Sequence, residues 1–254
     1  MSSGGFRTTH YQVTQMNIES TNDNTPTTPA ITYSECYRLP FLSLFHADCM
    51  DIMKQYPDKY FDLAIVDPPY GINVTNQTIG GSSLKKYKKE TEWDKQIPTE
   101  KYWNELFRVS KNQIVWGANY FNHSLEQGNK WLVWDKMLDI DSSHFEMAWT
   151  SFKGADRFIR YSRSKEQGFQ NPHRFHPTSK PVYLYDKTIM FFAKPNFKIL
   201  DTHFGSGSIA LAVDKANRLD KMNLHLTACE IDKEYIDKAI KRISESIKQG
   251  TLSF

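Results

Sequence analysis

The feature that most constrains this chain is an apolar run, Phe61–Val66, which ends abruptly in Asp67, Pro68, Pro69 and Tyr70. A short apolar run bounded by polar residues is typical of a buried strand in a parallel sheet. Neither proline has a backbone N–H, so the chain presents carbonyl oxygens beside a carboxylate that only accepts hydrogen bonds when ionised. Such a corner suits an amino group, and the tyrosine ring can stack on a planar base. The plainer alternative is a strand stop, with the aspartate as a cap and the tyrosine as packing.

The rest of the chain alternates between helical and strand-like patterns. Apolar residues recur at helical spacing over 99–110, 182–192 and 236–247, and short apolar runs occupy 113–116, 197–201 and 224–230. This alternation predicts an α/β sheet with helices on both faces. Consecutive strand-like runs without a helix between them, at 131–135, 146–152 and 157–161, predict an antiparallel edge.

Three segments do not fit this alternation. Residues 1–35 are rich in Ser, Thr, Asn and Pro and bury little apolar surface, so we expect a disordered tail. One domain is then predicted over 36–254. Irregular segments near 71–97 and 139–175 are long for a compact domain, and loops of that length are usually functional.

A second strand end also carries candidate chemistry, in the sequence "LDTHFGSGS" (200–208). Gly205 and Gly207 permit a tight turn with close backbone approach, and the helix that follows can hold an anionic group at its N-terminus. The next strand closes with Glu230, which is placed to bind ribose hydroxyls. Only two glycines are present where a pyrophosphate usually requires three, so a ligand with a ribose but no pyrophosphate fits better, and S-adenosylmethionine is one. A plain structural turn is the alternative.

Composition adds weaker constraints. The net charge of +3 is compatible with a polyanionic partner but does not require one. Three widely spaced cysteines predict reduced thiols and a cytoplasmic protein. No cysteine or histidine spacing suggests a metal site, no apolar run is long enough to cross a membrane, and we find no signal peptide.

Several segments together resemble the motifs of the DNA amino methyltransferases, in particular the adenine-modifying ones. "DPPY" (67–70) resembles their catalytic motif and "LDTHFGSGS" their cofactor loop, although Thr202 and His203 stand where many relatives have proline and other residues. Further matches are "FHADCMDIM" (45–53), "HPTSKP" (176–181) and "ACEIDKEY" (228–235). The resemblance covers about 40–245, and the catalytic motif precedes the cofactor loop, as in the beta group of that family.

The resemblance implies a Rossmann-like S-adenosylmethionine-dependent methyltransferase fold with a mixed seven-stranded sheet and helices on both faces. It implies a site-specific DNA methyltransferase that transfers a methyl group to the N6 amine of adenine after base flipping. The implied catalytic residues are Asp67, Pro68, Pro69 and Tyr70. The implied cofactor-binding residues are Asp48, Cys49, His176, Lys180, Asp201, Phe204, Gly205, Ser206, Gly207, Glu230 and Ile231.

DNA is the implied partner. The basic residues Lys85, Lys86, Lys88, Lys89, Arg157 and Arg163 lie in or near the two irregular segments, which we interpret as short target-recognition insertions. A solvated charged surface is the alternative for the lysine run. A cognate restriction endonuclease is a further candidate partner, and both a monomer and a homodimer stay open.

Three other functions compete with this interpretation. The same chemistry on the N4 amine of cytosine or on RNA is one, because "DPPY" is not exclusive to adenine enzymes. A catalytically inactive nucleic-acid-binding relative is another, which the intact "DPPY" and the Gly205–Gly207 pair disfavour. A nicotinamide oxidoreductase is disfavoured by the missing third glycine.

Overall fold

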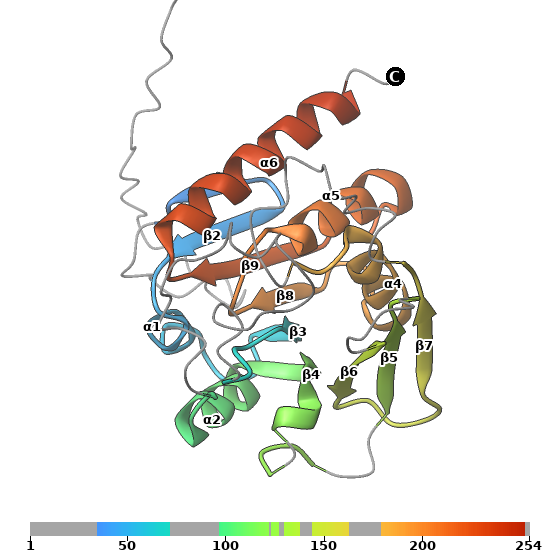
Figure 1. The fold of residues 1–254 in the computed structure, drawn as a ribbon. Helices are drawn as coiled ribbons and strands as arrows, with labels where there is room; N and C mark the ends of the chain where they lie inside the picture. Colours follow the sequence, from blue (N-terminus) through green and yellow to red (C-terminus); the bar gives the residue numbers. More distant parts are fainter. Residues whose placement is uncertain are drawn as a thin grey trace, which may run out of the picture.

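The computed structural model describes residues 35–71, 97–121, 123–126, 130–137, 144–162 and 179–251, with side chains as far as Gln249. Within these residues the chain forms one nine-stranded sheet with helices on both of its faces (Figure 1). The strands lie in the order β1-β2-β9-β8-β3-β4-β6-β5-β7. The predicted tail, the lysine run and most of the first irregular segment lie outside the described residues.

The strands differ in direction between the centre and the edges of the sheet. Neighbours from β2 to β4 are all parallel, whereas β1, β6 and β5 introduce antiparallel pairs. The strands are β1 (Tyr37–Leu39), β2 (Leu42–His46), β3 (Phe61–Val66), β4 (Ser110–Trp116), β5 (Trp131–Asp135), β6 (Phe145–Thr150), β7 (Arg157–Arg160), β8 (Lys198–Asp201) and β9 (His225–Glu230). The predicted antiparallel edge is confirmed for β5 and β6, although β7 pairs parallel to β5.

The helices cover the two faces of this sheet unequally. They are α1 (Cys49–Met53), α2 (Glu100–Val109), the 3-10 helix η4 (Ala118–Tyr120), α4 (Val182–Phe192), α5 (Ser208–Asp220) and α6 (Lys233–Thr251). Side chains of α4, α5 and α6 pack with one set of strand residues, and those of α1 and α2 pack with the other set.

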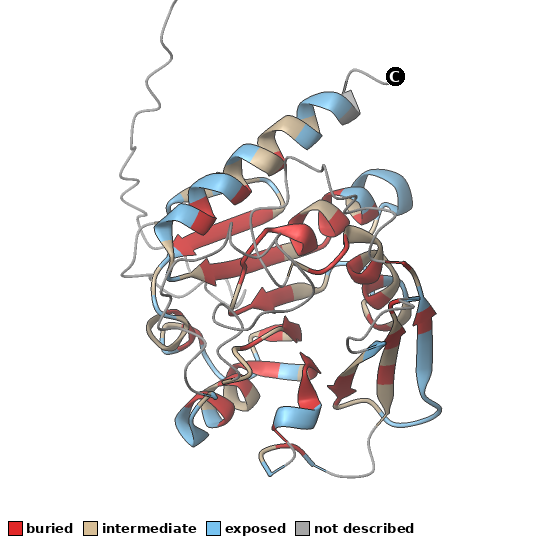
Figure 2. Ribbon diagram, in the orientation of Figure 1, coloured by how far each residue is buried: buried red, intermediate tan, exposed pale blue. Residues whose placement is uncertain are grey.

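Strand β3 shows why both faces are filled. Leu63 and Ile65 join the core under α4–α6, whereas Ala64 and Val66 join the core under α1 and α2. Successive side chains of a strand point to opposite faces, so a run that is apolar at every position is buried on both sides. Figure 2 shows the central strands almost entirely buried, while the outer side of α6 is exposed.

Local sequence sets where several of these elements begin and end. Asp48 accepts a hydrogen bond from the Met50 N–H at 2.8 Å and so caps the start of α1. Helix α2 passes directly into β4, and at this junction the backbone N–H of Ser110 still donates to the Leu106 carbonyl. The helix predicted over 99–110 and the strand predicted at 113–116 are therefore confirmed, with the strand starting earlier than expected.

The predicted α/β architecture is confirmed, but the sheet has nine strands where seven were expected. The short strands β1 and β2 were not predicted, because an edge strand and a strand containing Ser43 and His46 leave little pattern in the sequence. Within the segment 139–175, which was also interpreted as irregular, β6 and β7 confirm the strand-like runs predicted at 146–152 and 157–161. In the described part of the chain, no helix combines the length and the apolar character that crossing a membrane requires.

Candidate active site

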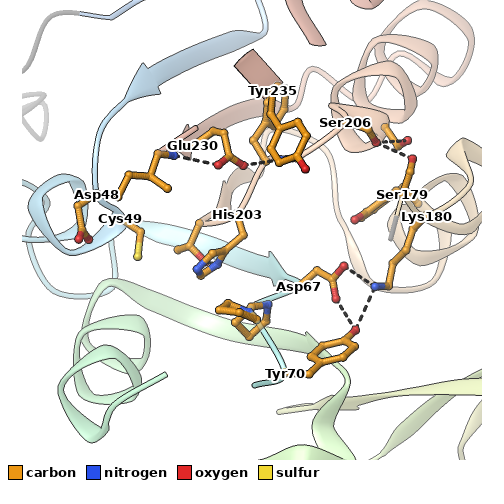
Figure 3. Close-up of a pocket in the computed structure, with 18 of the residues that line it drawn as sticks. Asp48, Cys49, Asp67, Tyr70, Ser179, Lys180, His203, Ser206, Glu230 and Tyr235 are labelled. Carbon is orange, nitrogen blue, oxygen red and sulfur yellow. Dashed lines mark hydrogen bonds and ion pairs between the residues drawn. The ribbon is translucent and has the colours of Figure 1, made fainter. Parts of the chain in front are cut away.

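The carboxyl ends of β3 and β8 meet at one pocket. The two strands pair in parallel, with Leu63 opposite Ile199 and Ala64 opposite Leu200, so the residues after both strands emerge at the same edge of the sheet. Ligands of open α/β sheets bind at this edge. Figure 3 shows side chains from both strand ends, from β9 and from the segment before α4 converging on the pocket.

Most of the residues singled out from the sequence line this pocket. They are Asp48, Cys49, Asp67, Pro68, Pro69, Tyr70, Lys180, Phe204, Gly205, Ser206, Glu230 and Ile231. Asp201 and Gly207 are not among the residues that line it, and His176 lies outside the described residues. The lining also contains residues that were not predicted: Ala47, Ser179, Tyr185, Thr202, His203, Ser208 and Tyr235.

Of the candidate DNA-binding residues, the structure describes Arg157 alone, and Arg157 does not line the pocket. Arg157 is exposed on the edge strand β7, where its guanidinium lies 5.6 Å from the centre of the Phe191 ring. Lys85, Lys86, Lys88, Lys89 and Arg163 lie outside the described residues. A role of these side chains in binding DNA therefore stays a prediction.

The carboxylate of Glu230 organises the end of the pocket at β9. Its Oε2 accepts the Gly205 N–H at 2.9 Å, and its Oε1 accepts the N–H groups of Ile231 and Asp232, each at 3.0 Å. Burial raises the pKa of Glu230, and the three backbone donors counteract that rise. Since a carboxylate oxygen can accept two hydrogen bonds, Oε2 retains capacity for a hydroxyl group of a ligand.

The turn after β8 is stabilised by its glycine conformations, by hydrogen bonds from α6 and by side-chain packing. Gly205 and Gly207 have positive φ angles of 52° and 72°, which favour glycine. From α6, the Arg242 Nη1 donates to the Ser206 carbonyl at 3.0 Å and to the Ser208 hydroxyl at 2.9 Å. A Cβ on Gly207 would lie 3.2 Å from the side chains of Ile243 and Phe204, so this glycine serves close packing.

Asp201 stabilises the start of the turn after β8 through its buried carboxyl group. Its side chain is buried, and Oδ1 accepts the backbone N–H of His203 at 3.0 Å. Burial raises the pKa of Asp201 to about 8, and the carboxylates of Asp67 and Glu230 act in the same direction against the His203 hydrogen bond. This hydrogen bond ties the Asp201 side chain to the start of the turn.

His203 is a pocket residue that the sequence did not identify as one. Its Nδ1 lies 2.9 Å from the Thr202 hydroxyl, which lies 2.8 Å from the Tyr102 hydroxyl on α2. Burial lowers the pKa of His203 to about 4, so its ring is neutral at neutral pH. Figure 3 shows this ring between Cys49 and Asp67.

The other end of the pocket is built around Asp67. Its Oδ1 accepts the Tyr70 hydroxyl at 2.5 Å, and its Oδ2 accepts the ammonium group of Lys180. The same ammonium lies 3.2 Å from the Tyr70 hydroxyl (Figure 3). Burial and the neighbouring Asp67 carboxylate raise the pKa of Tyr70 well above its ordinary value, so the phenol keeps its proton.

The ring of Tyr70 is fixed by its neighbours on and beside η4. It stacks on Tyr120 with ring centres 4.9 Å apart and an interplanar angle of 13°, and it contacts Phe121 edge-on. Gly117 has a φ of 68°, and a Cβ there would lie 2.1 Å from Cε1 of Tyr70. The glycine therefore leaves the space that the tyrosine ring occupies.

Comparison with known proteins points to DNA methylases. Residues 120–241 match the family model described as DNA methylase, of the N6/N4 type. This match includes the glycine turn and β9 but not the strand end at 67–70.

Two curated relatives are type II methyltransferases. M.HinfI of Haemophilus influenzae is 24% identical over an alignment of 251 residues; the match covers 80% of this chain and 68% of the relative. M2.LlaDCHI of Lactococcus lactis subsp. cremoris is 22% identical over an alignment of 255 residues; the match covers 82% of this chain and 91% of the relative.

Two solved methyltransferases share the fold. The M1.HpyAVI–SAM complex aligns with a TM-score of 0.50 and 18% identity, over 79% of this chain and 99% of the other. The cytosine-N4-specific PvuII DNA methyltransferase aligns with a TM-score of 0.52 and 13% identity, over 85% of this chain and 89% of the other. The predicted methyltransferase type of α/β fold is thus confirmed.

The raised pKa of Asp201 predicts a specific dependence of stability on pH. Between the ordinary carboxyl pKa of 3.8 and about 8, the folded chain holds a proton on Asp201 that the unfolded chain has lost. Rising pH therefore lowers the free energy of unfolding, by up to about 1.4 kcal/mol per pH unit. In Asp201→Asn this contribution is absent, so urea unfolding between pH 5 and 7 should show a shallower decline than in the wild type. Parallel curves for the two proteins would contradict the assignment.

The close approach of Gly117 to Tyr70 predicts a cost for a single methyl group. Gly117→Ala should lower the free energy of unfolding by about 1–3 kcal/mol more than Gly154→Ala, because only the former displaces an aromatic ring. Gly154 is a matched control, since its φ is also positive, at 110°, and its nearest atom to an added Cβ lies 3.7 Å away. Equal unfolding energies for the two variants in urea titrations would show that the ring does not need this space.

Proposed function

We propose that this chain, a DNA methyltransferase of the N6/N4 family, transfers the methyl group of S-adenosylmethionine to the exocyclic N6 amine of adenine in DNA, with the target base flipped out of the duplex. The observation that carries the proposal is the convergence of two strand ends on one pocket. A cofactor bound at the turn after β8 and an amine held at Asp67 would then face each other.

The donor set at β9 and at the turn fits S-adenosylmethionine. Oε2 of Glu230 has capacity left for a ribose hydroxyl, and the glycine turn allows a ligand to approach the backbone. Asp48, Cys49 and Ile231 line the adjoining part of the pocket and would surround the adenine of the cofactor. The related M1.HpyAVI structure was solved with SAM. When bound, S-adenosylmethionine supplies a methyl group that is activated by the sulfonium sulfur to which it is bonded, because this sulfur leaves as a neutral thioether.

The residues of the "DPPY" strand end would hold the acceptor. An adenine amine is a poor nucleophile because its lone pair is delocalised into the ring. The Asp67 carboxylate and the Pro68 carbonyl would each accept one amine hydrogen and so stabilise the positive charge that grows on the nitrogen. Holding both partners in one pocket supplies much of the remaining rate enhancement.

The aromatic residues beside Asp67 would help to hold the extruded base. Extrusion from the duplex costs a few kcal/mol, and stacking on an aromatic ring returns about 1–3 kcal/mol per base. The Tyr70 ring already belongs to an aromatic stack with Tyr120, so a base placed against it would extend an existing stack. The cost of extrusion and the gain from stacking are comparable, and further contacts to the DNA would supply the remaining free energy.

Partners follow from the same family assignment. The curated relatives are type II methyltransferases, so we propose a modification enzyme with a cognate restriction endonuclease. The positive charges at Lys85, Lys86, Lys88, Lys89, Arg157 and Arg163 would neutralise DNA phosphates.

The N4 amine of cytosine is the second candidate acceptor. One of the solved methyltransferases described above is cytosine-N4-specific, and an exocyclic amine of either base could donate to the same carboxylate and carbonyl. Mass analysis of nucleosides, after incubation of the protein with cofactor and DNA, distinguishes the two. Methylated adenosine is the expected product; methylated cytidine alone would move the proposal to cytosine, and no methylation of either base would refute it.

The proposed role of Asp67 predicts separate effects on transfer and on cofactor binding. Asp67→Ala should lower kcat by at least about 100-fold, because it removes an acceptor that acts on the developing charge. Cofactor affinity, measured by calorimetry, should change little, since Glu230 and the glycine turn remain.

Asp186→Ala is the matched control for this experiment. The Asp186 side chain is 16% exposed and is ion-paired with Lys215 on the surface, whereas that of Asp67 is 18% exposed and is ion-paired with Lys180. The control should keep wild-type turnover. Normal turnover in Asp67→Ala would remove this residue from the mechanism.

A further inference from the structure

A row of buried and half-buried charged side chains extends from Asp67 to residues outside the pocket lining. Lys180, with a side chain 3% exposed, contacts Asp67 and lies 3.4 Å from Oε2 of Glu146. Oε1 of Glu146 forms an ion pair with the Nζ of Lys136 at 2.8 Å. Glu146 and Lys136 do not line the pocket, and nothing in their sequence surroundings connects them to Asp67.

The antiparallel pairing of β5 and β6 creates this row. Glu146 lies opposite Trp134 in the register, and the Lys136 N–H just beyond β5 donates to the His144 carbonyl at 2.9 Å. The two side chains therefore reach each other across neighbouring strands. Each of the two cations also lies near an aromatic ring. The Nζ of Lys136 is 5.7 Å from the centre of the Trp134 ring, and the Nζ of Lys180 is 5.7 Å from the centre of the Trp116 ring.

The arrangement at Asp67 conflicts with the chemistry proposed for it. Oδ1 is bonded to the Tyr70 hydroxyl and Oδ2 to the Lys180 ammonium. An ammonium that stays on this carboxylate neutralises it and places a positive charge beside a nitrogen that is itself becoming positive. The amine would therefore bind best if Lys180 withdrew its charge from Asp67.

We propose that Glu146 receives the Lys180 ammonium when the substrate amine occupies Asp67, so that Glu146 is a positioning residue for methyl transfer. The inference rests on the proposed function. The present separation of 3.4 Å is about half an ångström longer than a charge-assisted hydrogen bond of roughly 2.7–2.9 Å, so a small rotation of the lysine side chain completes the exchange. Lys136 holds the Glu146 carboxylate in place through its other oxygen.

The charges balance through the whole exchange. Burial lowers the pKa of Lys180, but the carboxylates of Asp67 and Glu146 outweigh burial and raise it, so the lysine moves as a cation. During transfer the carbon–sulfur bond breaks with its electron pair on sulfur, and the nitrogen–carbon bond forms from the nitrogen lone pair. The proton that the nitrogen then loses passes to Asp67 and on to solvent.

Glu146→Gln tests the inference, because glutamine keeps the shape of the side chain but offers the ammonium no charge. We expect kcat to fall by roughly 10- to 100-fold. The KM for DNA and the affinity for S-adenosylmethionine should stay within about twofold, since no substrate contact is lost. Glu146→Asp, which restores the charge, should recover part of kcat.

Glu105→Gln is the matched control. The Glu105 side chain has the same 24% exposure as that of Glu146 and an ion pair of the same length, 2.8 Å, with Arg108 on α2. Its kcat should equal that of the wild type. An unchanged kcat in Glu146→Gln, or an equal loss in Glu105→Gln, would overturn the inference.

A double-mutant cycle with Lys180→Met distinguishes positioning from a general structural effect. If Glu146 acts only through Lys180, the double variant should have the same kcat as Lys180→Met alone. Multiplying losses would show that Glu146 acts independently and would overturn the inference. If the wild type transfers the methyl group but the variants contradict the role of Glu146, the proposed function stands and this inference falls. If the wild type shows no transferase activity, the proposed function and this inference both fall.

Discussion

The parallel pairing of β3 with β8 is the constraint on which the rest of the structure depends. Asp62 fixes this pairing at the opposite end of the strands, where its Oδ2 accepts the Lys198 N–H at 2.9 Å and its Oδ1 binds the Lys111 ammonium at 2.7 Å. With the register set there, the chain leaves β3 at Asp67 and leaves β8 at Asp201 on the same edge of the sheet. A shift of one residue would reverse the faces of every side chain in β8.

The two halves of the pocket are organised by carboxylates in different ways. Glu230 accepts backbone N–H groups of the turn after β8 and of the two residues between β9 and α6, so its position is set by the backbone. Asp67 is held by two side chains, Tyr70 and Lys180, and not by backbone donors. Under the proposed function, the half held by the backbone would suit a cofactor that binds in one way, and the half held by side chains would suit a substrate amine that replaces one of the existing donors.

The sequence predicted both strand ends because their signals are local. The "DPPY" corner and the glycine turn each depend on consecutive residues, and the periodicity of 99–110 and 182–192 marks α2 and α4 without reference to other segments. The same reasoning named Asp201 and Gly207 as cofactor contacts, and this assignment stays a prediction, since neither residue is among those that line the pocket. Spacing along a turn does not reveal which of its residues border a pocket.

Residues that depend on distant partners could not be predicted in this way. Lys180 was predicted as a cofactor-binding residue, and its contact with Asp67, 113 positions away in sequence, was not predicted. The sequence around Glu146 does not distinguish it from any other polar strand residue, and only the pairing of β5 with β6 brings it to Lys136. The spacing of the histidines spoke against a metal site, and nothing else in the sequence singled out His203. The structure shows its ring in the pocket lining, linked through Thr202 to Tyr102 on α2.

The most direct test of the account is a crystal structure of the protein with DNA and sinefungin, an analogue in which an amine replaces the reactive methylsulfonium group. The account predicts the analogue ribose on Glu230, and its amine within about 3.5 Å of a flipped base nitrogen that donates to Asp67. A ribose bound elsewhere, or a base amine held away from Asp67, would contradict it.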